Sequence, residues 1–246
     1  MADADPWESN ARWWQDGFTE GADAEYAEQI LPMAAEHLAG AVSVLDVGTG
    51  EGQVARLACG PGVGSRRVVG VDPTWAQLTV ARERGGGPSF GRAQAASLPF
   101  ATGSFDAVVA CLVFEHIDDV DGALAEVGRV LRAGGRFLFF LNHPLLQTPG
   151  SGWIDDHILD EQYWRIGPYL LEDKTLEEVE KDVFIPFVHR PLSRYVNAMA
   201  GAGLYLRRMD EPAPPPGFLA RATEYREAAT VPRLLFLLAE KAPPHR

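Results

Sequence analysis

The chain has 246 residues, of which 46% are hydrophobic and 23% charged, a balance that is typical of a globular protein with a buried core. Asp and Glu number 34 against 22 Lys and Arg, which gives a net charge of −12. A surface this acidic repels nucleic-acid phosphates and anionic lipid, so we expect neither as a partner.

Nothing in the sequence is typical of a membrane helix, an export signal or a metal site. The longest apolar runs, such as residues 107–114, are far shorter than the ~20 residues that span a bilayer. The first ten residues are acidic and contain no basic start followed by an apolar stretch. Cys59 and Cys111 lie in expected core elements without metal-ligand spacing. We therefore expect a cytoplasmic protein without a bound metal.

The N-terminal part combines aromatic residues with a predicted helix. An amphipathic helix is expected over residues 23–38, and Trp7, Trp13, Trp14 and Phe18 precede it. Trp13, Trp14 and Phe18, together with Tyr26, can form a plain hydrophobic flap on the core or a cover over a bound ligand.

The middle of the chain alternates short β-branched runs with helical stretches, which is typical of βαβ units and a parallel sheet. The helix after the second strand is expected to open with a capping box of Thr74 and Gln77. A later helix carries an apolar stripe through residue 131 and ends at Gly134 and Gly135. The strands are predicted at residues 42–47, 67–72, 89–95, 107–114 and 136–141.

Beyond residue 142 this alternation breaks down, and proline and glycine occur among aromatic and acidic residues. A long segment of this kind between core elements is typically functional, so a lid or substrate wall is predicted. A helix from residue 192 to the glycines near 201 and strands at 204–209 and 233–240 complete the chain. The expected organisation is one domain over 1–246, with a helical cover at 1–40, a core at 41–143, the insertion at 144–190 and the rest of the sheet at 191–246.

A glycine-rich turn, DVGTGEG at residues 46–52, lies between the first predicted strand and its helix. Such a turn needs residues without Cβ, and the following helix presents free N–H groups to a ligand. Asp72 ends the second predicted strand, where a carboxylate can accept the ribose hydroxyls of an adenosine-type cofactor.

The turn differs from both common phosphate-binding patterns. A dinucleotide fingerprint would need glycine where Gln53 stands, and no P-loop sequence occurs in the chain. Asp46 precedes the first glycine by two positions, and Glu51 lies on the turn. These acids suit an ammonium group better than a pyrophosphate.

Five motifs follow one another in the middle of the chain: VLDVGTGEG at 44–52, GVDPT at 70–74, LPF with GSFD at 98–106, FEHI at 114–117 and LRAGG at 131–135. They resemble the motifs of class I S-adenosylmethionine (SAM)-dependent methyltransferases, in particular the small-molecule branch that includes the ubiquinone/menaquinone C-methyltransferases. The resemblance covers roughly residues 42–141. It implies a Rossmann-like α/β fold in which a seven-stranded, mostly parallel sheet has helices on both faces and its last-numbered strand, 233–240, is antiparallel.

The resemblance also assigns roles for binding SAM, whose product is S-adenosylhomocysteine (SAH). Asp46 would hold the amino group, Asp72 the ribose and Pro73 the adenine. Gln94 stands where many relatives have an Asp for the adenine amino group, and its amide oxygen can still accept that bond. The other positions expected to contact the cofactor are Gly48, Thr49, Gly50, Ala95, Ala96, Cys111 and His116.

Methyl transfer from a sulfonium depends mainly on positioning and exclusion of water, so a metal is not required. An acceptor that must lose a proton needs a general base, and His116, His143 and His189 are the candidates. Each of them can equally be a structural histidine. The substrate side is expected to include Trp14, Phe18 and Tyr26 together with His143 and His189.

The sequence therefore predicts a SAM-dependent methyltransferase with a small-molecule acceptor. Two alternatives stay open: a SAM-binding sensor or partner subunit without catalysis, and an NAD(P)-dependent oxidoreductase. The acceptor, the methylated atom and the oligomeric state are not indicated by the sequence.

Overall fold

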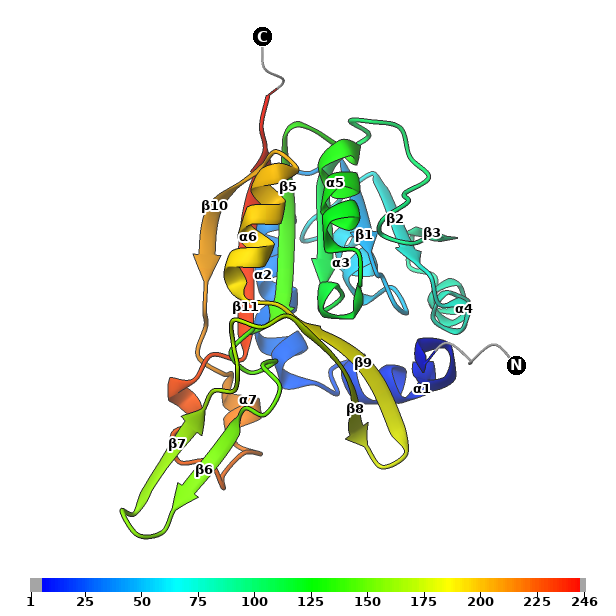
Figure 1. The fold of residues 1–246 in the computed structure, drawn as a ribbon. Coiled ribbons are helices and arrows are strands. Elements are labelled where there is room, and N and C mark those ends of the chain that lie inside the picture. Colours follow the sequence, from blue (N-terminus) through cyan, green and yellow to red (C-terminus); the bar gives the residue numbers. More distant parts are fainter. Residues whose placement is uncertain (1–5, 244–246) are drawn as a thin grey trace, which may run out of the picture.

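The computed structural model describes residues 6–243, and a seven-stranded sheet forms its centre (Figure 1). The strands lie in the order β10-β11-β5-β4-β1-β2-β3. Strands β1 to β5 pair in parallel, whereas β11 is antiparallel to both of its neighbours. The predicted Rossmann-like sheet with an antiparallel last strand is therefore confirmed. Its strands are β1 Ser43–Val47, β2 Arg67–Asp72, β3 Ser89–Arg92, β4 Phe105–Cys111, β5 Leu131–Asn142, β10 Leu204–Asp210 and β11 Leu234–Lys241.

The sheet is covered on both faces because its central strands are apolar on both sides. Every residue of β4 is buried. One face packs against α5 (Val120–Val130) and α6 (Leu192–Gly201), and the other against α2 (Leu31–Leu38) and α3 (Gln53–Cys59). No helix among residues 6–243 is long and apolar enough to cross a membrane.

Several boundaries differ from the predicted ones. The fourth strand was expected to reach residue 114 but ends at Cys111, and a 3₁₀ turn, η2 (Phe114–His116), follows shortly after it. The helix expected to run to the Gly134–Gly135 pair ends at Val130, and β5 begins at the next residue. Backbone pairing of Leu131 with Phe105 draws this segment into the sheet and ends the helix early.

The predicted capping box at α4 (Trp75–Arg84) is wrong. Thr74 makes no side-chain cap, and the carboxylate of Glu8 instead accepts the N–H groups of Trp75 and Ala76 at 2.8 and 3.0 Å. Gln77 accepts a hydrogen bond from Gln15 at 2.9 Å. The helix is thus capped from a distant segment, which a local sequence pattern does not reveal.

The N-terminal segment is more helical than predicted. Residues Pro6–Phe18 form α1, which holds the aromatic cluster, and the helix expected over residues 23–38 divides into a π-helical turn, η1 (Tyr26–Ile30), followed by α2. Figure 1 shows α1 at the end of the sheet, below α4 and beside the strands β8 and β9.

The insertion consists of two β-hairpins that the irregular sequence did not predict. The first pairs β6 (Gly152–Asp156) with β7 (Glu161–Arg165), and the second pairs β8 (Asp173–Glu180) with β9 (Val183–His189). The first hairpin projects from the body of the protein beside α7 (Pro216–Leu219), whereas the second approaches α1 (Figure 1). Only the second is therefore placed to border a site at this end of the sheet.

Candidate active site

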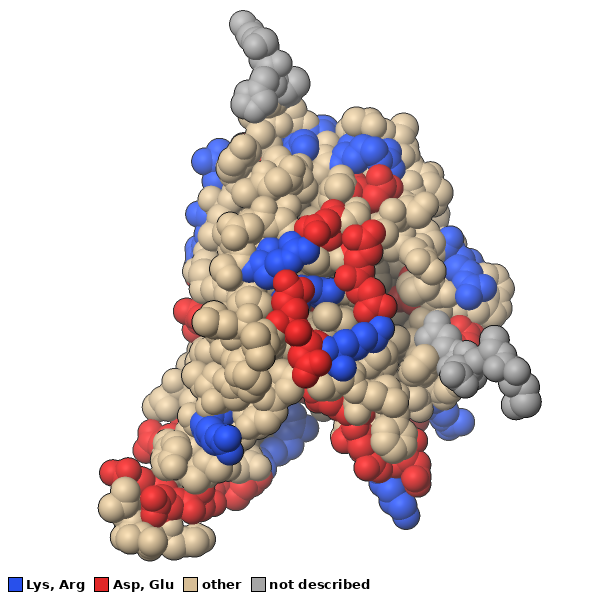
Figure 2. Space-filling view, in the orientation of Figure 1, with Lys and Arg blue, Asp and Glu red and all other residues tan. Residues whose placement is uncertain are grey.

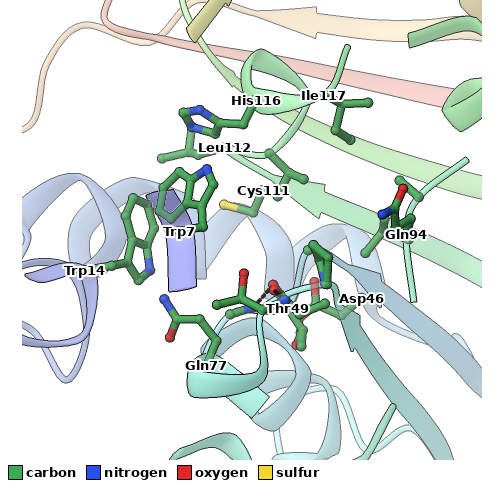
Figure 3. A pocket seen from close by; sticks show the side chains of 18 of the residues that line it. Trp7, Trp14, Asp46, Thr49, Gln77, Gln94, Cys111, Leu112, His116 and Ile117 are labelled. Carbon is green, nitrogen blue, oxygen red and sulfur yellow. Dashed lines mark hydrogen bonds between the residues drawn. The ribbon is translucent and has the colours of Figure 1, made fainter. Parts of the chain in front are cut away.

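A cavity of about 520 Å³ opens at the carboxyl ends of β1, β2 and β4, between α1 and the second hairpin (Figure 3). This is the edge at which open α/β sheets bind ligands. Every residue that the sequence assigned to cofactor binding lines it: Asp46, Gly48, Thr49, Gly50, Asp72, Pro73, Gln94, Ala95, Ala96, Cys111 and His116.

The glycine turn after β1 forms the floor of the cavity. Gly48, Gly50 and Gly52 have φ angles of +70°, +54° and +89°, a region that side chains with Cβ rarely adopt. A Cβ on Gly48 would collide with the side chain of Val113, and one on Gly52 with the ring of Phe90. Both the backbone conformation and the packing therefore require glycine here.

Asp46 is a buried acid at the end of β1, with 2% of its surface exposed. Its Oδ2 accepts a 2.7 Å hydrogen bond from the hydroxyl of Thr49, and the backbone of Ala55 provides a further bond. Burial nevertheless raises the pKa of Asp46 to about 7, because the charged form is poorly solvated. A cation in the cavity would offset this cost.

Asp72 lies at the end of β2 and links the glycine turn after β1 to the segment that follows β2. Its Oδ2 accepts the N–H of Gly50 at 2.9 Å, and its Oδ1 accepts the N–H of Thr74 at 2.8 Å. Two such bonds fix the carboxylate plane, so the carboxylate faces the cavity in one orientation.

Glu51 also lines the cavity, and its carboxylate is buried against Arg56 and Arg84, which form ion pairs with Oε2. These ion pairs offset part of its negative charge, but Glu51 still contributes to the raised pKa of Asp46.

His116 contributes to the opposite wall of the cavity (Figure 3). Its Nδ1 lies 2.8 Å from the carbonyl oxygen of Pro186, which can only accept, so Nδ1 carries the proton and Nε2 is left as an acceptor. The ring packs against those of Trp7 and Phe187 with centroids 4.7 and 4.6 Å apart. Burial lowers the pKa of His116 to about 4, so the imidazole is neutral near pH 7.

Helix α1 supplies an aromatic wall. Trp7 and Trp14 line the cavity, whereas Phe18 lies behind Trp14, with the two rings stacked at 4.4 Å. Trp7 was not among the predicted site residues. Its spacing of seven from Trp14 places both on one face of a helix, which could have indicated it if α1 had been foreseen.

Tyr26 also lines the cavity, at the first residue of the π-helical turn. Its hydroxyl lies 3.5 Å from Sγ of Cys111, the last residue of β4. Burial raises the pKa of Tyr26, so its hydroxyl stays protonated.

The other two candidate histidines are buried but do not line the cavity. Nε2 of His143 lies 2.7 Å from the carboxylate of Glu211, and Nε2 of His189 lies 2.8 Å from the carbonyl oxygen of Tyr169. The structure thus brings His116 together with the glycine turn and separates His143 and His189 from it.

A mostly parallel sheet with a glycine turn and two acids at its carboxyl edge is the architecture of α/β proteins that bind nucleoside-containing cofactors. Comparison with known families narrows this class: residues 45–139 match the methyltransferase domain family. This part of the chain is similar to methyltransferase domains.

Curated relatives and solved structures agree with this assignment. The chain is 37% identical over 145 residues to an uncharacterized methyltransferase of Bacillus subtilis, which covers 56% of this chain and 54% of the relative. It is 37% identical over 132 residues to a ubiquinone/menaquinone biosynthesis C-methyltransferase of Methylobacterium nodulans, which covers 52% and 50%. The chain therefore spans about half the length of the curated relatives it matches.

The structural match extends further along the chain. A SAM-dependent methyltransferase from Mesorhizobium loti superposes with a TM-score of 0.75 and 26% identity, over 89% of this chain and 98% of that one. The fold over most of the chain is thus that of SAM-dependent methyltransferases.

Proposed function

We propose that this protein is a SAM-dependent methyltransferase that transfers a methyl group to a small-molecule acceptor. The observation that carries the proposal is that Asp46, near the end of β1, and Asp72, at the end of β2, flank one glycine turn at the floor of one cavity. SAM offers an ammonium group and a ribose diol, the two groups that carboxylates in these positions suit.

The residues present fit this cofactor. Asp46 is a buried acid with no cationic partner among residues 6–243, and the cofactor's amino group would provide one. Asp72 would accept the ribose hydroxyls, and Pro73, Gln94, Ala95 and Ala96 would surround the adenine. Gly48, Thr49, Gly50 and Cys111 would face the methionine part. When bound, SAM supplies an electrophilic methyl group on a sulfonium.

The remaining wall residues would act on the acceptor. Trp7 and Trp14 form an aromatic face that excludes water and attracts a sulfonium cation. Neutral His116, with Nε2 as an acceptor, is suited to hold an O–H or N–H of the acceptor and to receive its proton. His143 and His189 would support the walls through their hydrogen bonds.

A small acceptor is supported by the cavity volume of about 520 Å³ and by the net charge of −12, which disfavours nucleic acid. The name of the Methylobacterium relative makes quinone-type rings a first class of acceptor to test. A cytoplasmic location is part of the proposal and rests on the sequence alone.

Calorimetry with SAH, followed by transfer from SAM labelled in its methyl group to a fractionated metabolite extract, tests the proposal. Stoichiometric SAH binding with a labelled product is the expected result. SAH binding without any labelled product would favour a sensor or partner subunit. Binding of NAD(H) without SAH would favour an oxidoreductase and overturn the proposal.

A further inference from the structure

Arg190 lies at the junction of β9 and α6, next to His189, and its side chain is buried with 3% of the residue exposed. Its guanidinium donates to three backbone carbonyls of one loop. The distances are 3.2 Å from Nη1 to Phe114, 2.7 Å from Nη2 to Ile117 and 2.8 Å from Nη2 to Asp118.

These carbonyls belong to the loop that follows β4 and contains η2. Two of these carbonyls also accept a backbone N–H: that of Phe114 from Ile117 at 3.3 Å, and that of Asp118 from Val120 at 3.2 Å. Arg190 adds a charged donor to both and also bonds the carbonyl of Ile117. Its planar guanidinium holds the three carbonyls with a fixed geometry that a lysine ammonium does not reproduce. The loop therefore depends on a side chain more than 70 positions away.

His116 and Ile117 from this loop line the cavity. The imidazole of His116 is held by Pro186, which lies on β9, the strand after which Arg190 follows. Arg190 and Pro186 thus fasten the same short loop from one hairpin, the first through its carbonyls and the second through the imidazole.

Ion pairs extend this connection across the surface. Nε of Arg190 lies 3.6 Å from Glu172, which also pairs with Arg194 at 3.2 Å. Lys174 on β8 pairs with Asp118 at 2.7 Å. Figure 2 shows acidic and basic side chains alternating on the face that carries α5 and α6. The hairpin and the loop are therefore joined by charge as well as by hydrogen bonds.

We propose that Arg190 is a positioning residue that fixes the loop bearing His116 and so sets the acceptor-side wall of the cavity. This inference rests on the proposed function for its catalytic meaning. Among residues 6–243, the hydrogen bonds and the ion pair of Arg190 join it to the loop after β4 and to Glu172, and not to the turn after β1 or the end of β2, which form the cofactor floor. Loss of Arg190 should therefore affect His116 far more than cofactor binding.

Nuclear magnetic resonance of protein labelled with ¹⁵N-histidine tests this without any acceptor. His116→Asn assigns the His116 signals, which should show the neutral form with the proton on Nδ1 between pH 5.5 and 8. Groups near the ring are Trp7 on α1, Phe187 on β9, and Glu115, Asp118 and Lys174 around the loop. In Arg190→Met the loosened ring should be solvated, so its pKa should rise by about one unit or more towards the ordinary value.

Calorimetry on the same variant should show SAH affinity within about threefold of wild type. Arg190→Lys should give a smaller shift of the His116 pKa, and it carries the test if Arg190→Met does not fold. Arg194→Met is the matched control, because Arg194 shares Glu172 but donates to none of the three carbonyls; its His116 signals should be unchanged.

Unchanged His116 signals in folded Arg190→Met and Arg190→Lys would overturn the proposal. A loss of SAH affinity in proportion to the shift of the His116 pKa would also overturn it, because that result would indicate general destabilisation of the protein. If wild type fails to bind SAH, the proposed function fails, but the resonance experiment still decides whether Arg190 positions His116.

Discussion

The backbone N–H of Gly50 donates a 2.9 Å hydrogen bond to Oδ2 of Asp72, so the glycine turn after β1 and the acid that ends β2 form one unit. The acid has a structural role as well as a predicted role in binding ribose. A change at Asp72 should therefore weaken the cofactor site more than the loss of one ligand contact would.

Asp72→Ala is expected to lower SAH affinity by about 30-fold or more, because it removes a charged acceptor and releases Gly50 and Thr74. Isothermal titration calorimetry measures this directly. Asp106→Asn is a suitable control. Asp106 also accepts two backbone N–H groups, from Val42 and Ser43, but at the opposite end of the sheet. The Asp106→Asn variant should lower the melting temperature and leave the SAH affinity near that of wild type. A lost SAH affinity in Asp106→Asn together with a normal affinity in Asp72→Ala would contradict the assignment of Asp72 to the cofactor site.

The ionised form of Asp46 should lower the stability of the empty protein and strengthen the binding of the cofactor. Its pKa is raised to about 7 in the folded protein by burial, above the ordinary carboxyl value. The folded state therefore holds a proton that the unfolded state loses, and the contribution of Asp46 to the free energy of unfolding falls as the pH rises from about 4 to about 7.

Asp46→Asn should then melt at a higher temperature than wild type at pH 8, and this difference in melting temperature should narrow at pH 5. SAH affinity of the variant at pH 8 should fall about tenfold or more, because the cationic amino group loses its carboxylate. Thermal melts and calorimetry at both pH values test this. Glu115, whose pKa is also raised to about 7 by burial, is present in both proteins and cancels in the comparison.

Much of this site could be predicted from local sequence because its parts lie in short motifs. Asp46 and Asp72 each end a β-branched run, and parallel strands bring such ends to one edge of the sheet. Trp7 and the Glu8 cap were missed because they depend on where α1 packs, which no local pattern specifies. The sequence made His116, His143 and His189 candidates for a general base, and only tertiary packing places His116 alone of the three in the cavity.

The Glu8 cap predicts a link between α1 and the lifetime of the bound state. Glu8→Ala removes the acceptor for Trp75 and Ala76, and a lost cap typically costs about 1 kcal/mol. Helix α1 should then leave the cavity more often, and SAH should dissociate about three- to tenfold faster in stopped-flow tryptophan fluorescence. Asp16→Ala, on the same helix, alters only an exposed pair with Arg12 and should dissociate like wild type. Equal rates for all three proteins would show that α1 does not retain the cofactor.

His116 and His143 should differ in their effect on transfer. His116→Asn keeps an N–H for Pro186 but lacks Nε2, and it should slow single-turnover methylation about 100-fold or more if the acceptor must lose a proton. His143→Gln should keep the rate and lower the melting temperature, because His143 pairs with Glu211 away from the cavity. A slow His143→Gln variant with a normal His116→Asn variant would reverse the assignment.

The central claim is that Asp46 and Asp72, on the two sides of the glycine turn, bind SAM. A crystal structure of the complex with SAH tests it most directly. The account predicts the amino group beside Asp46, the ribose hydroxyls on Asp72 and the adenine near Gln94. SAH bound elsewhere, or a ribose that does not contact Asp72, would contradict it.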